Sequence, residues 1–279
     1  DDLQAVQGAL TSLKYFHDEA PGYHIIAAGT PPVPAMHSGI SFPVGKVTFM
    51  DLYPLNFIEF LDATGDNALA EILRKNDMEM ANVFRDRYIE RLRQYFFTGG
   101  MPEPVARFCA GRDYTEVREL QKQILDTYEH DFSKYAPVKI VPRIRMLWNS
   151  IPAQLARENR KFVYGLVKEG SRAKDYELAL SWLIDCGLVY KVQRVEKPSF
   201  PLKAYADVKA FKLFMVDTGL LTAMTDIDSK TLLEGNKIFT EFKGTFTEQY
   251  VFQQLVNSQE YTVYYWSAER STAEVDFLL

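Results

Sequence analysis

Two adjacent carboxylates, Asp1 and Asp2, open the sequence, and Thr30 follows an apolar run that ends in a glycine. In phosphoryl-transfer ATPases an acid at the end of a buried strand holds Mg²⁺, and the next acid polarises the attacking water. A hydroxyl at the end of a neighbouring strand can sense the γ-phosphate. The pattern indicates Asp1 as the Mg²⁺ and ATP ligand, Asp2 as a catalytic acid and Thr30 as a catalytic, ATP-sensing residue. The structural alternatives are a solvated acid pair and a turn threonine that bonds its own backbone.

A second group of acids lies late in the sequence. Glu248 falls in a predicted helix, and Glu274 and Asp276 fall around a predicted strand. Restriction-type nuclease folds gather Mg²⁺ ligands from a helical Glu, a strand Asp and a Glu-x-Lys motif on the following strand. That following strand is absent from the sequence. We therefore expect a nuclease-like remnant without cutting activity, and we keep a metal-dependent nuclease as a third functional hypothesis.

An ATPase also needs a loop that cradles the phosphates. A P-loop has four residues between two glycines, followed by Lys and then Ser or Thr. The run from Gly39 to Gly45 encloses five residues, Val47 follows Lys46, and Pro43 removes a backbone donor. No other segment fits the pattern. We therefore expect a fragment of a longer ATPase that lacks its Walker A segment, so that ATP and Mg²⁺ bind only in the full-length form.

The charge of the chain is unevenly distributed. The formal net charge is −5, yet residues 139–203 contain 13 Lys and Arg against six Asp and Glu. A basic region in an acidic chain suggests a surface that faces a polyanion such as DNA. A solvated helical region or a protein-contact module accounts for the same charges. The candidate nucleic-acid contacts are Arg157, Arg160, Lys161, Arg172, Lys174, Arg194 and Lys197.

Composition argues against several other classes of protein. Hydrophobic residues make up 47% and charged residues 25% of the chain, as in ordinary globular proteins. No apolar run reaches the roughly 18 residues of a membrane span. Cys109 and Cys186 are far apart, which fits a reducing cytoplasm better than a disulfide framework, and the histidines form no metal-binding pair. We expect a cytoplasmic protein without membrane contact.

Periodicity and turn residues divide the chain into four parts. Strands are predicted near 23–30 and 44–50, and helices at 9–16 and 55–61. A helix at 174–186 followed by paired strand-like runs is typical of a winged helix. We predict an α/β protein with a partial P-loop-type parallel sheet. Its parts are the C-terminal part of an AAA-type ATPase core (1–65), a helical lid or connector (66–138), a winged-helix-like domain (139–202) and a truncated nuclease-like α/β domain (203–279).

Several motifs, spread in one order over nearly the whole chain, resemble a known family. They include Asp1-Asp2-Leu3-Gln4, Ala27-Ala28-Gly29-Thr30, Tyr53-Pro54-Leu55-Asn56-Phe57, Gly99-Gly100-Met101-Pro102-Glu103, Ser150-Ile151-Pro152-Ala153-Gln154-Leu155, Val216-Asp217-Thr218-Gly219-Leu220, Thr247-Glu248-Gln249-Tyr250-Val251 and Ala273-Glu274-Val275-Asp276-Phe277. Together they are similar to AAA+-type P-loop ATPases that carry a DUF4143 C-terminal region.

The resemblance implies an ATP-hydrolysing protein of regulatory or remodelling role. It places Asp1 on the Walker B aspartate, Asp2 where the family has Glu, and Thr30 where it has Ser. An Asp in place of Glu is shorter and weakens water positioning. The alternative is a DNA-binding winged-helix module with a degenerate ATPase and an inactive nuclease-like fold. Expected partners are ATP, and DNA or a protein through the winged-helix region. We also expect oligomerisation, because the missing sheet strands would leave an apolar edge exposed.

Overall fold

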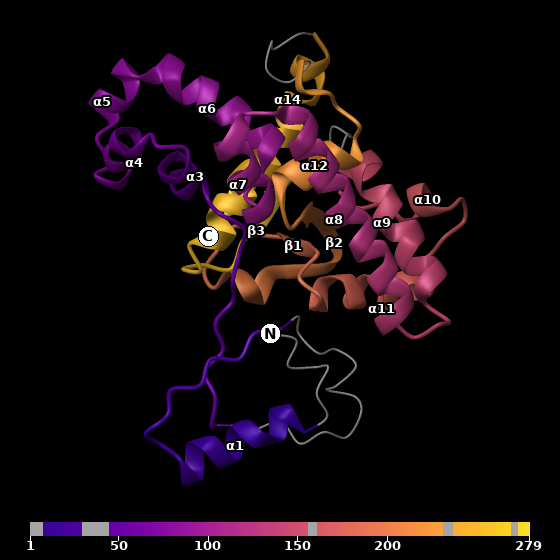
Figure 1. The fold of residues 1–279 in the computed structure, drawn as a ribbon. Helices are drawn as coiled ribbons and strands as arrows, with labels where there is room; N and C mark the ends of the chain where they lie inside the picture. Colours follow the sequence, from indigo (N-terminus) through magenta and orange to yellow (C-terminus); the bar gives the residue numbers. More distant parts are fainter. Residues whose placement is uncertain (1–7, 30–44, 156–160, 231–236, 269–272) are drawn as a thin grey trace.

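The computed structural model describes residues 8–29, 45–155, 161–230, 237–268 and 273–279. The structure is mixed α/β: helices dominate, and one open four-stranded sheet lies among them (Figure 1). The predicted α/β class is confirmed at this level. Among the described residues no helix is long and apolar enough to cross a membrane.

The first described segment contains helix α1 (Ala9–Glu19) and extended chain, and it lies below the rest of the molecule in Figure 1. Helix α1 confirms the helix predicted at 9–16. The strands predicted at 23–30 and 44–50 are wrong over their described residues, which belong to no strand. A strand needs a neighbour that pairs its N–H and C=O groups, and no strand in the described ranges pairs with these residues. The predicted parallel P-loop-type sheet is therefore not supported by the described part of 1–65.

Residues 57–135 form a layer of helices, which confirms the helical character predicted for 66–135. The first of them begins at Asn56, whose side chain accepts a hydrogen bond from the Glu59 N–H while Glu59 caps the Asn56 N–H in return. The helices of this layer are α3 (Phe57–Ala63), α4 (Asn67–Arg74), α5 (Met78–Val83), α6 (Arg85–Thr98), α7 (Pro102–Gly111) and α8 (Tyr114–Tyr135).

Three further helices precede the sheet: α9 (Val141–Leu155), α10 (Tyr164–Val167) and α11 (Ala173–Asp185). Helix α11 confirms the helix predicted at 174–186. Helix α9 runs through Ile151 with Pro152 inside it. The buried side chains of Trp148 and Ile151 hold α9 against its neighbours, and this packing offsets the lost hydrogen bond of the proline.

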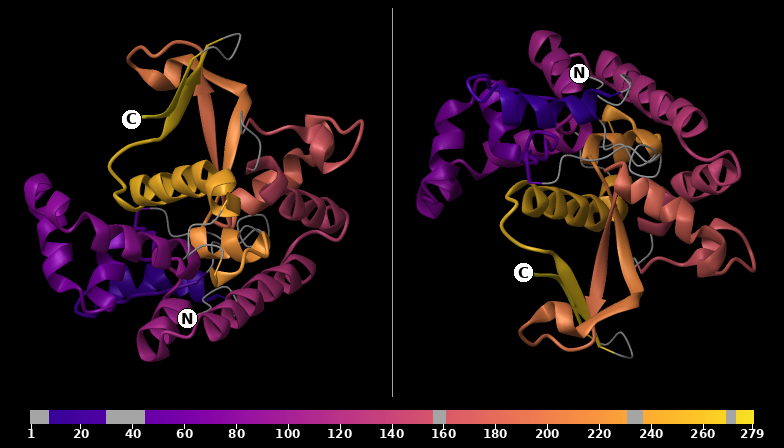
Figure 2. Two further views of the ribbon diagram at one scale, coloured as in Figure 1. Left: turned by 90° about the horizontal axis from the view of Figure 1, so that it is seen from above. Right: turned by 90° about the horizontal axis from the view of Figure 1, so that it is seen from below.

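The sheet has the strand order β2-β1-β3-β4. Strands β1 (Val189–Val195) and β2 (Ala206–Met215) are antiparallel, β1 and β3 (Tyr264–Ser267) are parallel, and β3 and β4 (Glu274–Leu278) are antiparallel. The turn between β1 and β2 contains the 3-10 helix η2 (Leu202–Tyr205). Figure 2 shows the β1–β2 ribbon reaching beyond the helical body, with β3 and β4 beside its far end. The paired strand-like runs predicted after the helix at 174–186 form one strand, β1, whose antiparallel partner is β2.

Helices α12 (Thr218–Met224) and α14 (Lys237–Asn257) connect the sheet to the helical layer. The rings of Phe214 on β2 and Phe252 on α14 stack with their centroids 4.4 Å apart. Burying an aromatic side chain of this size stabilises the fold by about 2 kcal/mol. This packing fixes one face of α14 against the sheet, so that Glu248 on the same helix is positioned relative to β2.

Candidate functional site: a buried lysine among three carboxylates

Lys212 is the most unusual residue of the sheet. It stands in the middle of a strand segment whose six residues from Ala210 to Met215 are all buried, and its side chain is only 1% exposed. A buried ammonium is costly unless it is paired and hydrogen-bonded. The surroundings of Lys212 must therefore supply negative charge.

Three carboxylates supply this charge from two other elements. The Lys212 Nζ lies 2.5 Å from Glu274 Oε1, 3.3 Å from Asp276 Oδ1 and 3.4 Å from Glu248 Oε2. Glu248 comes from α14, whereas Glu274 and Asp276 are two residues apart on β4 and so share one face of the strand. We call these four residues the Lys212 cluster.

The Lys212 cluster is closed on one side and open on the other. Glu248 is 14% exposed and Glu274 29%, but the Asp276 side chain is 52% exposed. With one ammonium and three ionised carboxylates the cluster carries an excess of negative charge. An excess of carboxylate oxygens at a solvent-accessible edge can attract a hard cation such as Mg²⁺.

Tyr265 on β3 forms the floor of the site. The Lys212 Nζ lies 5.0 Å from the centroid of its ring, within the range of a cation–π contact. Burial raises the pKa of the Tyr265 hydroxyl to about 12, an effect that nearby Arg194 opposes and Glu274 strengthens. The hydroxyl therefore stays protonated at neutral pH and is a hydrogen-bond donor.

The structure brings together the three acids that the sequence singles out in its last part, and it adds Lys212 to them. Sequence reasoning missed the lysine. The available signal was its position in the apolar run Phe211-Lys212-Leu213-Phe214-Met215, because a charge in a buried strand requires partners. Asp1, Asp2 and Thr30 lie outside the described residues.

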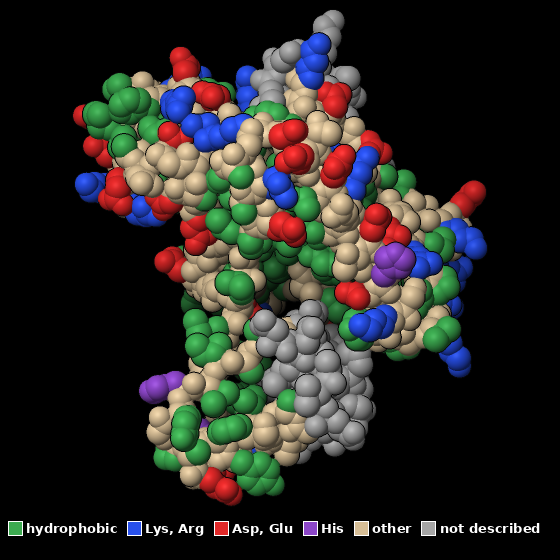
Figure 3. All heavy atoms as spheres, viewed as in Figure 1, with side chains coloured by type: hydrophobic (Ala, Val, Ile, Leu, Met, Phe, Trp, Pro, Cys, Tyr) green, Lys and Arg blue, Asp and Glu red, His purple; other side chains and the backbone are tan. Residues whose placement is uncertain are grey.

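The predicted nucleic-acid contacts differ in exposure where the structure describes them. Arg157 and Arg160 lie outside the described residues, and Lys161, Arg172, Lys174 and Lys197 are exposed. Arg194 is partly buried, and its Nη2 donates a 2.7 Å hydrogen bond to Asp207 Oδ2. Lys and Arg side chains gather at the edge of the molecule formed by α10 and α11 (Figure 3).

Asp217 is a second buried charge, and its role is structural. Its carboxylate accepts hydrogen bonds from the backbone N–H of Gly100 at 2.6 Å and of Leu220 at 3.0 Å, and from Gln253 Nε2 at 3.1 Å. Burial raises the pKa of Asp217, although these donors oppose the effect. Because the donors come from the α6–α7 turn, α12 and α14, Asp217 ties three elements together.

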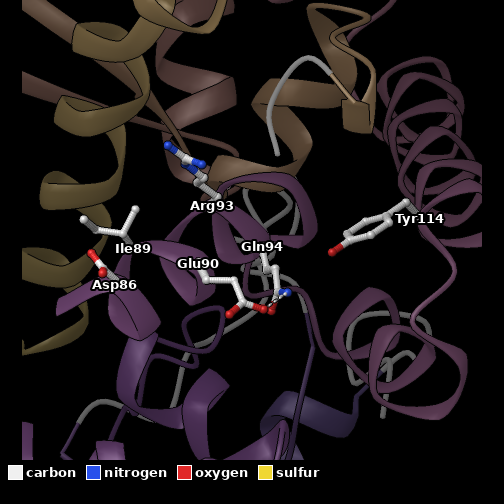
Figure 4. Close-up of a pocket in the computed structure, with 6 residues that line it drawn as sticks. All are labelled: Asp86, Ile89, Glu90, Arg93, Gln94 and Tyr114. Atoms are coloured by element: carbon white, nitrogen blue, oxygen red, sulfur yellow. Dashed lines mark hydrogen bonds between the residues drawn. The ribbon is translucent and has the colours of Figure 1, made fainter. Parts of the chain in front are cut away.

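A hollow of about 550 Å³ lies along α6 and the start of α8 (Figure 4). It shares no residue with the Lys212 cluster, and its lining mixes acidic, basic, amide and apolar side chains without concentrating one charge. We therefore assign the candidate site to the Lys212 cluster. The hollow is lined by Asp86, Ile89, Glu90, Arg93, Gln94 and Tyr114.

Comparison with known proteins gives one match. A family model described as Domain of unknown function (DUF8612) matches residues 89–231, which is just over half of the chain. No curated protein and no solved structure matches. The resemblance to AAA+-type ATPases with a DUF4143 region is wrong, because the matching family model is a different one. The individual motifs were short, and their shared order was not specific enough to identify a family.

Proposed function

The chain belongs to the DUF8612 family, whose description assigns no activity, and we propose that it is a divalent-cation-dependent hydrolase acting on nucleic-acid phosphodiester bonds. The observation that carries this proposal is the Lys212 ammonium, 1% exposed and within 3.4 Å of three carboxylate oxygens. A carboxylate pair beside a lysine is a donor set suited to phosphate chemistry, because the acids can hold a hard cation and the lysine can neutralise phosphate charge.

The donor set fits Mg²⁺ or Mn²⁺ through two carboxylates. Among the described residues no group of three or more His, Cys, Asp or Glu side chains is arranged to hold a metal ion, which agrees with Lys212 lying among the three acids. Mg²⁺, however, needs only one or two carboxylates when water and substrate phosphate complete its shell. Glu274 and Asp276 are the accessible pair on one face of β4, and we propose them as the ligands.

The other two residues of the cluster act on the charge and position of the reacting groups. Bound Mg²⁺ would supply a polarised phosphate oxygen and an acidified water. Lys212 donates hydrogen bonds from a fixed position on the buried strand, so it can stabilise negative charge that develops on a phosphate. Glu248 holds the Lys212 ammonium at 3.4 Å and keeps it aimed at the carboxylate pair.

The segment from α9 to β2 supports a nucleic-acid substrate. Three helices followed by the antiparallel pair of β1 and β2 have the element order of a winged helix, and we propose a winged-helix-like module here. The outer face of α11 carries Glu177, the 72% exposed Leu178 and Asp185, a surface unsuited to reading bases. We therefore propose that Lys161, Lys174 and other exposed lysines contact phosphates, without sequence preference.

The test is cleavage of fluorescently labelled single-stranded and duplex DNA in the presence of Mg²⁺ or Mn²⁺, with EDTA as the metal-free control. We expect metal-dependent cleavage and a loss of roughly 100-fold or more in Asp276→Asn. Glu260→Gln is the matched control, because Glu260 is an exposed acid that makes no ion pair with Lys212. Intact DNA under all metal conditions, or equal rates for Asp276→Asn and wild type, would reject the proposal.

ATP binding and hydrolysis through Asp1, Asp2 and Thr30 stay a prediction from the sequence. These residues lie outside the described part of the chain, and the family resemblance that strengthened the prediction is wrong. The corresponding test is ATP turnover by the protein and by Asp1→Asn. Undiminished turnover in the variant would remove Asp1 from any such mechanism.

A further inference from the structure

A row of polar side chains crosses the sheet and leads into the Lys212 cluster. Arg194 on β1 is in register with Asp207 on β2 and with Tyr265 on β3. Residues in register on neighbouring strands have their side chains on the same face of a sheet. The Lys212 Nζ lies over the ring of Tyr265 and contacts Asp276. Arg194 and Tyr265 therefore stand directly beside the proposed catalytic cluster.

Two hydrogen-bond donors in this row are buried and unpaired. In the part of the chain that the structure describes, Arg194 Nε and Tyr265 Oη have no hydrogen-bond partner. Tyr265 is 1% exposed, and the Arg194 side chain is 24% exposed. Buried donors are normally satisfied, so each unpaired one requires an explanation. A bound acceptor that reaches either donor would satisfy it.

Positive charge exceeds negative charge only at the Arg194 end of this row, where Arg194 and Lys161 face Asp207, whereas Glu274 lies near Tyr265. Asp207 occupies only the Nη2 end of the Arg194 guanidinium, and this contact orients the group while leaving Nε available. Burial opposes the ionisation of Asp207, but hydrogen bonds and the positive charges of Arg194 and Lys161 lower its pKa overall. Lys161 is exposed and close enough to add positive potential here. The row thus has a cationic end at Arg194 and an anionic end at Asp276.

We infer that Arg194 and Tyr265 form an anion subsite that takes a phosphate group of the nucleic-acid backbone next to the Lys212 cluster. The inference rests on the proposed function for the identity of the ligand, whereas the donors themselves stand on the geometry. Guanidinium groups bind phosphate through fixed N–H donors. A phosphate held at the Arg194 end would leave Glu274 and Asp276 free to hold the cation.

The experiment measures binding apart from cleavage. Isothermal titration calorimetry measures the binding of two probes, inorganic phosphate and a thymidine dinucleotide, in EDTA, which prevents metal-dependent cleavage. The proteins titrated are wild type, Tyr265→Phe and Arg194→Gln. We expect saturable binding of both probes by wild type and a loss of at least 10-fold in each variant. Tyr265→Phe removes only the hydroxyl and keeps the ring under Lys212. Tyr261→Phe, at a 60% exposed tyrosine, is the matched control and should bind like wild type. Circular dichroism checks that each variant is folded.

The outcomes separate this inference from the proposed function. If Asp276→Asn still binds phosphate but no longer cleaves DNA, the result supports both the anion subsite and the proposed hydrolase. Phosphate binding that depends on Arg194 and Tyr265, without any cleavage, supports the subsite and rejects the hydrolase. Cleavage by a protein that binds neither probe, or binding unchanged in Tyr265→Phe and Arg194→Gln, overturns the subsite.

Discussion

Replacing Lys212 by Met tests whether the charge at the centre of the cluster holds the sheet and α14 together. Methionine has a similar volume and no charge, so the substitution removes the ammonium with little change in packing. At an effective dielectric constant near 20, two unit charges about 3.4 Å apart attract by about 5 kcal/mol before desolvation is subtracted. Removing one partner of a buried ion pair costs about 3–5 kcal/mol, because the remaining charge stays buried and unpaired.

The exposed fractions of the three acids determine how much the free energy of unfolding should fall in Lys212→Met. The side chains of Asp276 and Glu274 are 52% and 29% exposed and can turn toward water. The loss of their contacts with Lys212 should therefore contribute little to the loss of stability. Glu248, at 14%, is the least exposed of the three acids and has the least room to turn toward water. We therefore expect Lys212→Met to lower the free energy of unfolding by about 3 kcal/mol, the lower end of the range for a buried pair. Lys209→Met, at an exposed lysine of the same strand, should change it by less than about 0.5 kcal/mol.

Urea denaturation followed by tryptophan fluorescence measures these differences, and a double-mutant cycle isolates the pair. Glu248→Gln removes the buried charge that Lys212→Met leaves behind, so the double variant should be more stable than the sum of the single effects predicts. We expect a coupling of about 1–3 kcal/mol. Additive effects of the two substitutions, or a Lys212→Met protein as stable as wild type, would refute the view that the pair is energetically linked.

Other predictions concern the scaffold. Asp217→Ala leaves the buried backbone N–H groups of Gly100 and Leu220 unpaired and should cost about 3 kcal/mol or more, measured by urea denaturation. Gly100→Ala would drive its Cβ into the backbone of Leu55, so thermal unfolding should show a clear loss of stability. Burial opposes the ionisation of Asp66, but its contacts with Arg91 and Arg87 lower the pKa overall. Asp66 therefore contributes stability above its unfolded pKa of about 3.9 that is lost as the pH falls through the lower folded value; Asp66→Asn should flatten the acid limb of a stability–pH curve.

The sequence predicts those elements whose local signals agree with their tertiary environment. The helix at α11 shows a periodic apolar face that is buried in the structure, including Leu180 and Leu183, and it ends before Gly187. The strands predicted at 23–30 and 44–50 have the same apolar, β-rich composition as β1. A β-rich composition, however, does not ensure that a neighbouring strand is present to form backbone hydrogen bonds with the segment.

The candidate site was only partly predictable for a similar reason. Glu248, Glu274 and Asp276 stand out because acids near strands and on helices are familiar metal ligands. Their common partner, Lys212, precedes Glu248 by 36 residues and Asp276 by 64. Nothing local shows that β2 and β4, at opposite edges of the strand order, bring these side chains to one point. That requires the twist of the sheet and the position of α14, which only packing determines.

The extent of the DUF8612 match adds a physical constraint on how the site is built. The matched residues, 89–231, contain Lys212 and Arg194 but none of the three acids, which come from α14 and β4. A polypeptide limited to the matched residues would leave the Lys212 ammonium without the carboxylates that it contacts, and β1 without its partner β3. An unpaired buried charge and an open strand edge both oppose a stable fold. The cationic half of the site therefore lies in the family segment, its anionic half comes from the chain that follows, and the complete Lys212 cluster forms only when both are folded together.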